Sequence, residues 1–184
     1  MMVAKLLKLL TLIIAFGLNT KIMAQVIQDF TNDNKLTNWF IVNDDVMGGI
    51  SSCNFYIDKN GYAIFKGTIS TAYNGGFASI RYNAYDIQTK NKSFLELLLK
   101  GDNKKYQLRI KANNRDYQSY VFSFETSDEW ETITIPIEEM YASFRGRRLN
   151  MKNFDESSIS QISILAGNKK NEDFELKIKE ISIK

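Results

Sequence analysis

The sequence contains no histidine, which excludes several kinds of chemistry. Without an imidazole there is no Ser-His or Cys-His nucleophile system, no His-ligated zinc, and no access to the commonest general base. The single cysteine, Cys53, can form neither an intrachain disulfide nor a thiolate metal site, so we expect a small buried side chain there. GxxxxGK and GxGxxG motifs are also missing. The enzyme classes left open are carboxylate-pair hydrolases and metal-assisted enzymes.

The acids that those remaining enzymes would need are scattered over predicted strands and turns, with no paired constellation. We therefore predict that the protein is not an enzyme and uses no cofactor. Proline is as scarce as cysteine, with one residue of each. The only one, Pro136, is expected at a strand end or a sheet edge.

The N-terminal segment has the layout of a secretory signal peptide. Lys5 and Lys8 precede an apolar run over 9–18, and Ala24 ends a fair cleavage signal. The run is shorter than the roughly 20 residues of a membrane span. We predict cleavage before Gln25, export to the periplasm or the medium, and no membrane span afterwards. An uncleaved anchor is the alternative.

The charge balance changes once this segment is removed. The chain has 24 basic and 21 acidic residues, and three of the lysines lie within residues 1–24, which leaves 21 basic against 21 acidic residues. A net charge near zero gives no general attraction to nucleic acid or anionic lipid, so we expect no nucleic-acid partner. The remaining 160 residues, 25–184, suit a single domain.

Apolar and polar residues alternate along much of this domain, as in half-buried strands. Tyr106, Leu108 and Ile110 alternate with polar neighbours, and the phase of a late strand slips before Ile181, which predicts a bulge. Gly- and Asn-containing turns separate the segments at sandwich-like spacing. Further strands are predicted over 26–30, 39–42, 53–57, 62–70, 77–82, 93–100, 120–125, 132–137 and 159–165. The predicted fold class is all-β, a jelly-roll β-sandwich.

One segment differs from ordinary strand-and-turn sequence, namely W-F-I-V-N-D-D-V-M-G-G-I-S-S over 39–52. Its paired acids Asp44 and Asp45, followed by Gly48 and Gly49 and then Ser51, could hold a cation of the calcium type. The same residues could instead close the loop through Asx-type hydrogen bonds, which is the favoured interpretation. We therefore predict no metal, with Asp44 and Asp45 as the only weak candidate ligands.

This segment resembles the signature of the complex I intermediate-associated protein 30 family. The resemblance continues through F-K-G at 65–67, N-G-G-F-A-S-I-R at 74–81 and K-G-D-N-K-K-Y at 100–106, where Asn103 replaces a glycine. Trp130, I-P at 135–136 and F-R-G-R at 144–147 also fit, while Ile137 departs from the usual aromatic. The resemblance implies a galactose-binding-like sandwich and a non-catalytic, chaperone-like assembly role. It also implies a fold similar to carbohydrate-binding modules.

Two groups of residues are candidates for binding. Phe77, Ser79 and Arg81 would share one face of a strand, because side chains i, i+2 and i+4 align, although Phe77 could be core and Arg81 an ion-pair partner. The second group is Phe144, Arg145 and Arg147, with Arg148, in a basic-aromatic loop suited to a carboxylate, a phosphate or an acidic protein surface, unless it is simply solvated.

Three functions remain open at this point. The first is an exported assembly-factor or chaperone-like protein that binds another polypeptide. The second is a carbohydrate-binding module, for which Tyr106, Tyr117 and Tyr120 could stack on sugars, although Tyr106 and Tyr120 follow the core phase. The third, a carboxylate-based hydrolase, is the least favoured.

Overall fold

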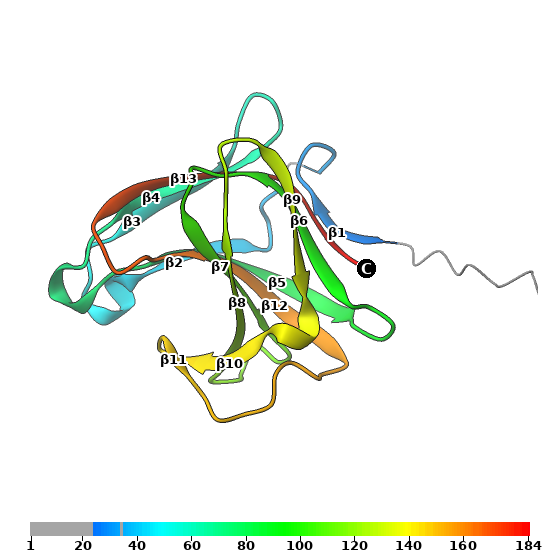
Figure 1. Cartoon of the computed structure of the whole chain (residues 1–184). Coiled ribbons are helices and arrows are strands. Elements are labelled where there is room, and N and C mark those ends of the chain that lie inside the picture. The colour runs from blue at the N-terminus through cyan, green and yellow to red at the C-terminus, as the bar shows by residue number, and fades with distance from the viewer. Residues whose placement is uncertain (1–23, 34) are drawn as a thin grey trace, which may run out of the picture.

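The computed structural model describes residues 24–33 and 35–184, which form two antiparallel β-sheets stacked face to face (Figure 1). The predicted signal peptide lies outside the described residues, except for Ala24. Among the described residues there is no helix that is both long and apolar enough to cross a membrane.

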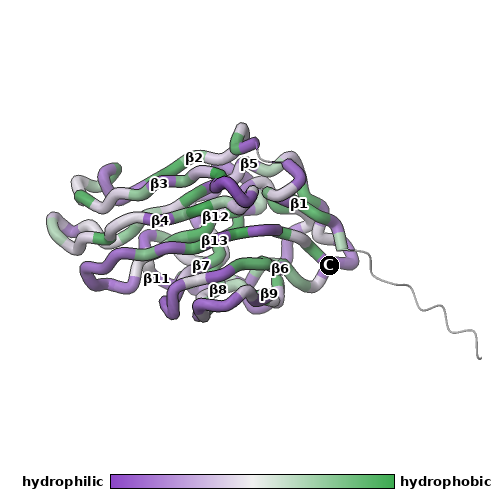
Figure 2. The backbone as a smooth tube through the Cα atoms, turned by 90° about the horizontal axis from the view of Figure 1, so that it is seen from above, coloured by the Kyte–Doolittle hydropathy of each residue, from purple (hydrophilic) through white to green (hydrophobic). Residues whose placement is uncertain are grey.

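The upper sheet in Figure 1, here called sheet A, has the strand order β3-β4-β13-β6-β9, with β1 also paired to β13. Figure 2 looks onto these strands and shows them side by side in that order. Their bounds are β1 Gln25–Asp29, β3 Ser52–Ile57, β4 Ala63–Ile69, β6 Phe94–Lys100, β9 Trp130–Pro136 and β13 Glu172–Ile183.

The lower sheet, sheet B, has the order β11-β10-β8-β7-β12-β5-β2. Its bounds are β2 Trp39–Asn43, β5 Ala78–Gln88, β7 Lys105–Lys111, β8 Ser119–Glu125, β10 Tyr141–Phe144, β11 Arg147–Arg148 and β12 Ser158–Ala166. Short 3-10 turns occur at η1 Asp44–Met47, η2 Ala72–Asn74 and η3 Ile137–Glu139.

The core between the sheets follows from the alternation in the sequence. Each strand turns every second side chain inward, and the inward positions of β7, Tyr106, Leu108 and Ile110, are at most 1 % exposed. Leu95, Leu97 and Leu99 of β6 meet them from sheet A with no exposed surface. The same alternation appears as green and purple segments along the tube in Figure 2. The prediction of an all-β jelly-roll sandwich is therefore confirmed.

Most predicted strands are present, and the details differ where local sequence is a weak guide. The bulge before Ile181 is confirmed by a register shift between Ile178 and Glu180. Pro136 ends the edge strand β9, as expected. The strand predicted over 77–82 is wrong in extent, because it begins at Ala78 and continues to Gln88 past an irregularity in its pairing with β12.

Cys53 is partly buried on β3, and its thiol donates a hydrogen bond to Asn43 Oδ1 at 3.1 Å. Burial raises the pKa of this thiol to about 11, and the hydrogen bond to Asn43 offsets only part of that rise. Because only the thiolate is reactive, this cysteine has the inert character expected of a packing residue.

Candidate functional site

The carboxylate of Asp44 joins two loops at one end of the sandwich. Asp44 has no exposed surface, and its Oδ1 accepts a hydrogen bond from the backbone N–H of Ser51 at 2.9 Å. Its Oδ2 accepts from Ser51 Oγ at 2.5 Å and from the N–H groups of Gly76 and Phe77 at 2.6 and 3.2 Å. The loop after β2 is thereby fixed to the loop before β5.

The neighbouring glycines leave room for this carboxylate. A Cβ atom on Gly49 would lie 2.3 Å from Asp44 Cγ, and one on Gly75 would lie 2.6 Å from Asp44 Oδ2. Any other residue at either position would therefore displace the carboxylate. Burial alone would raise the pKa of Asp44, but the hydrogen bonds from Ser51, Gly76 and Phe77 outweigh it and lower the pKa.

The sequence offered two roles for Asp44 and Asp45, and the geometry matches loop closure. Both Asp44 oxygens are used by N–H and O–H donors, whereas Asp45 is exposed. Within the part of the chain that the structure describes, no group of three acids or cysteines is placed to hold a metal ion. Gly48 only ends η1, in the left-handed conformation.

The two joined loops present apolar side chains to solvent. They lie side by side at the left of Figure 1 and again in Figure 2. Tyr73 is 72 % exposed and has a positive φ of 55°, which is uncommon for an aromatic residue. We call these exposed residues the apolar tip: Val46, Met47, Ile50 and Tyr73.

A different surface lies on the outer face of sheet B. The pairing register places one side chain from each of six neighbouring strands in a single line across this face. With strands about 4.8 Å apart, the line is about 24 Å long. We call it the central row: Phe40, Arg81, Ser163, Arg109, Val121 and Tyr141.

Positive charge gathers at the middle of the central row. Arg81 and Arg109 are half-buried on either side of Ser163, and Lys111 lies one row away on β7. Burial lowers the pKa of Arg81, and burial followed by the charge of Arg81 lowers the pKa of Arg109. Burial and then Arg81 also lower the pKa of Lys111, although Asp116 opposes this.

These two arginines lack acidic partners. Among the described residues neither forms an ion pair, since every salt bridge found involves a lysine. Arg109 donates from Nε and Nη2 to Gln107 Oε1 at 3.0 and 2.6 Å, which fixes the plane of its guanidinium. The side chain of Arg81 makes no hydrogen bond within the described part of the chain. Their N–H donors are therefore available to a ligand.

Of the residues predicted to bind on β5, the structure places Ser79 and Arg81 on one face, but not as a matched pair. Ser79 is 1 % exposed and donates from Oγ to Val42 O at 2.6 Å, so it holds β2 against β5. Phe77 precedes the strand, and its backbone N–H is bound by Asp44. Of Phe77, Ser79 and Arg81, only Arg81 belongs to the central row and has side-chain N–H groups that are free to bind a ligand.

The second predicted group is a hairpin and not the loop that the sequence favoured. Strands β10 and β11 pair through Phe144 and Arg147, and Arg145 and Gly146 form a two-residue turn with φ of 47° and 75°. Arg145 Cζ lies 5.3 Å from the ring of Phe144, which also meets Tyr117 edge-on at 5.5 Å.

This hairpin reaches the central row through Arg148. Its Cζ lies 4.8 Å from the ring centre of Tyr141, the last residue of the row.

Tyr106 and Tyr120 are core residues, 1 % and 5 % exposed, as their phase predicted. Tyr117 is exposed beside the hairpin.

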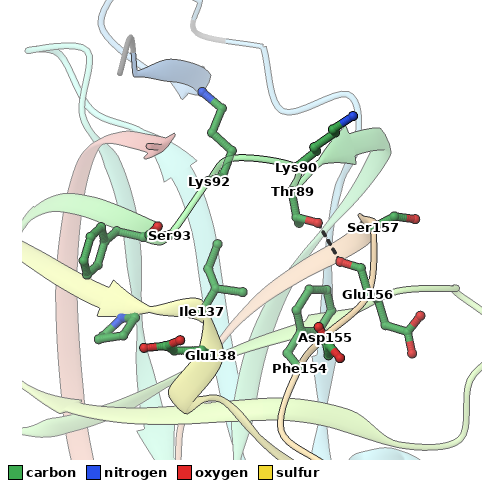
Figure 3. Close-up of a pocket in the computed structure, with 12 residues that line it drawn as sticks. Thr89, Lys90, Lys92, Ser93, Ile137, Glu138, Phe154, Asp155, Glu156 and Ser157 are labelled. Atoms are coloured by element: carbon green, nitrogen blue, oxygen red, sulfur yellow. Dashed lines mark hydrogen bonds between the residues drawn. The ribbon is translucent and has the colours of Figure 1, made fainter. Parts of the chain in front are cut away.

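A hollow of about 590 Å³ lies at another end of the sandwich, between the loop over 89–93, η3 and the loop over 154–157 (Figure 3). Thr89 Oγ1 donates to Glu156 O at 2.6 Å and joins two of its walls. Glu138 and Glu156 lie on opposite sides of the view, with Phe154 and Asp155 between them. Asp155 also lines the hollow. All three acids are exposed, and no described hydrogen bond fixes any of their carboxylates. The hollow lacks the fixed acid pair of a hydrolase.

The K-G-D segment is also explained by internal bonding. Asp102 accepts hydrogen bonds from Tyr106 Oη at 2.9 Å and from the N–H of Glu175 at 3.0 Å, and its carboxylate lies 2.7 Å from Lys104 Nζ. Burial, together with the negative charge of Asp102, raises the pKa of Tyr106. This motif therefore ties the β6–β7 turn to β13.

Sequence reasoning missed Ser163, Arg109, Lys111 and Tyr141 as members of the surface around Arg81. Arg109 and Lys111 occupy the polar positions of a correctly predicted alternating strand, which was the available signal. Their proximity to Arg81 depends on β12 lying between β5 and β7, an order that sequence alternation does not contain.

We predict that Asp44→Asn lowers the free energy of unfolding by about 2–4 kcal/mol at pH 7, because an amide cannot accept from four donors as a carboxylate does. The folded pKa is below the ordinary value of 3.8, so this stability is complete above about pH 4 and is lost as the pH falls through the folded pKa. Urea unfolding at pH 7, 5 and 3 tests this.

The control for this prediction is Asp45→Asn at the exposed neighbouring acid, which should stay within about 0.5 kcal/mol of the unmodified protein. A difference between Asp44→Asn and the unmodified protein that is equally large at pH 3 and pH 7 would contradict a role for the ionised carboxylate.

Comparison with solved structures shows the same fold in carbohydrate-binding modules. A family 11 carbohydrate-binding module from Clostridium thermocellum, in complex with a β-1,3-1,4-mixed-linked tetrasaccharide, has a TM-score of 0.66 at 18 % identity, covering 87 % of this chain and 94 % of that one. The family 11 module of the C. thermocellum cellulase Lic26A-Cel5E has a TM-score of 0.67 at 18 % identity, covering 89 % and 95 %.

A family 29 carbohydrate-binding module has a TM-score of 0.53 at 15 % identity, covering 87 % of this chain and 86 % of that one. At these identities the likeness shows a shared galactose-binding-like jelly roll.

A search of curated protein sequences finds no match. The profile of complex I intermediate-associated protein 30 matches residues 28–178, which is most of the chain. The protein therefore belongs to the complex I intermediate-associated protein 30 family.

Proposed function

We propose that this protein is a non-catalytic binding domain that holds an extended glycan across the outer face of sheet B. The observation that carries the proposal is the central row, in which Phe40 and Tyr141 lie at the two ends and unpaired arginines lie between them. Aromatic faces pack against sugar rings, and guanidinium, amide and hydroxyl groups bind sugar hydroxyls.

The shared fold supports this proposal but does not identify the ligand of this protein. A family 11 module with the same fold was solved in complex with a tetrasaccharide, which shows that such a sandwich can carry a sugar chain. For the present chain the argument rests on the length and side chains of its own row. Gln107 and Gln161, on either side of that row, add amide groups to the same face.

We predict that Phe40→Ala weakens glycan binding about tenfold, because the few residues that carry a binding surface, among which aromatic side chains are enriched, cost more than about 1 kcal/mol when truncated. Tyr56→Ala is the matched control, since Tyr56 lies on sheet A and is 40 % exposed against 38 % for Phe40. A glycan array identifies ligands, and calorimetric titration compares the variants. Silence across the array, or equal losses in both variants, would refute glycan binding by the row.

A second function, chaperone-like capture of another polypeptide, is favoured by the apolar tip. Val46, Met47, Ile50 and Tyr73 expose apolar surface on loops that Asp44 holds rigid. Rigid, exposed apolar clusters are typical of protein interaction sites. The family's assembly-factor role agrees with a surface of this kind.

We predict that Met47→Glu removes any polypeptide partner of the tip, because a charge would have to be buried in the contact. Val26→Glu is the control, since Val26 lies on β1 and is 52 % exposed against 54 % for Met47. Crosslinking and pull-down with the three proteins test this. A partner captured equally well by Met47→Glu does not use the tip.

We also propose that the protein is exported and that residues 1–24 are removed. Support comes from β1, which starts at Gln25 and pairs with β13 from that residue onward, so cleavage after Ala24 leaves every described strand complete. The expected product has the mass of residues 25–184 and is found in the periplasm or the medium. Intact mass measurement of fractionated cells tests this, and a membrane-bound product that keeps residues 1–24 would contradict it.

A further inference from the structure

The middle of the central row has the form of an anion-binding position. Ser163 lies between Arg81 on one neighbouring strand and Arg109 on the other. Serine is small and only 7 % exposed, and its hydroxyl makes no hydrogen bond within the described part of the chain, so a free donor remains between the two longer side chains. The arginines are about 9.6 Å apart at the backbone, twice the strand spacing, which lets both reach one group above Ser163.

The charges around this position are unbalanced. Lys111 adds a third cation in the next row, with Nζ donating to the backbone oxygen of Asp116 at 2.5 Å. The Asp116 carboxylate accepts from the backbone N–H of Asn113 and belongs to its own turn. Glu125 lies at the far end of β8, where its Oε1 is 3.8 Å from Lys105 Nζ. Half-buried guanidinium groups are normally matched by carboxylates, and no residue in the described part of this protein supplies one here.

We infer that the ligand supplies the missing acid, and that the glycan held on sheet B is an acidic one whose uronate carboxylate binds over Ser163 between Arg81 and Arg109. This inference rests on the proposed glycan function and names its ligand class. The guanidinium of Arg109, oriented by Gln107, presents its remaining N–H groups to one carboxylate oxygen, and Arg81 presents its own to the other.

An acidic polypeptide fits this face less well than an acidic glycan. Extended peptides usually bind by adding a strand to a sheet edge, where backbone groups are free. The backbone groups of β5, β12 and β7 are paired on both sides within the sheet, so the face offers only side chains. A polyuronate has both features the row requires, namely carboxylates for the arginines and apolar ring faces for Phe40 and Tyr141.

The test uses residues 25–184 with three probes: polygalacturonate, the same polymer fully methyl-esterified, and poly-L-glutamate. The variant is Arg81→Gln with Arg109→Gln. The control is Lys59→Gln with Lys66→Gln, which removes the same charge from the β3–β4 hairpin of sheet A. Affinities are measured by calorimetry at low and physiological salt, since a purely diffuse attraction is screened equally in both variants.

The expected result is that polygalacturonate binds at least tenfold more tightly than its methyl ester. The arginine variant should lose at least tenfold for the acidic polymer and little for the neutral one, and the lysine control should lose less than twofold. Equal affinity for the acid and the ester would overturn the acidic-ligand inference while leaving glycan binding intact. If neither polymer binds and the glycan array shows no ligand, the proposed function itself is wrong.

Two further measurements test which polymer is the ligand and where its carboxylate binds. Binding of poly-L-glutamate as tight as that of polygalacturonate, with the same loss in the arginine variant, would overturn the glycan as the ligand. Ser163→Asp supplies a carboxylate between the arginines from the protein itself, so it should raise the thermal midpoint and abolish the preference for the acidic polymer. A lower midpoint with an unchanged preference would show that the anion does not bind there.

Discussion

The buried carboxylate of Asp44 is the interaction on which the geometry of this end of the sandwich depends. It binds Ser51, Gly76 and Phe77, and so connects the end of β2 with the start of β5. The backbone of Asp44 also donates to Phe77 O at 3.2 Å. These contacts fix the register in which Phe40 lies opposite Arg81. An internal bond at one end of the molecule therefore helps to set the outer face of sheet B.

The most distinctive sequence motifs are explained largely by structure and not by ligand contact. Asp44 and Asp102 both sit in acid-and-glycine segments that resemble binding loops in sequence. Each accepts hydrogen bonds from the chain itself: Asp44 ties its turn to the loop before β5, and Asp102 ties its turn to β13. The proposed ligand surface is made of less distinctive residues on regular strands, among them Arg81, Ser163 and Arg109.

The sequence predicts the fold better than it predicts the site, for a physical reason. Alternation identifies a strand and its inward face, as it did for Tyr106, Leu108 and Ile110. It does not say which strands are neighbours, so it could not bring Arg81 and Arg109 together. The β10–β11 hairpin was missed because Arg145 and Gly146 form a tight turn between strands only four and two residues long.

The pairing of β1 with β13 places Gln25 beside Ile183. When the chain is synthesised or translocated from its N-terminus, β1 therefore has no pairing partner until residues 180–183 of β13 have emerged. Contacts between such distant segments form slowly, because the intervening loop has to be closed first. The sandwich is therefore completed only after β13 has emerged, and until then β1 stays available to the edges of other sheets.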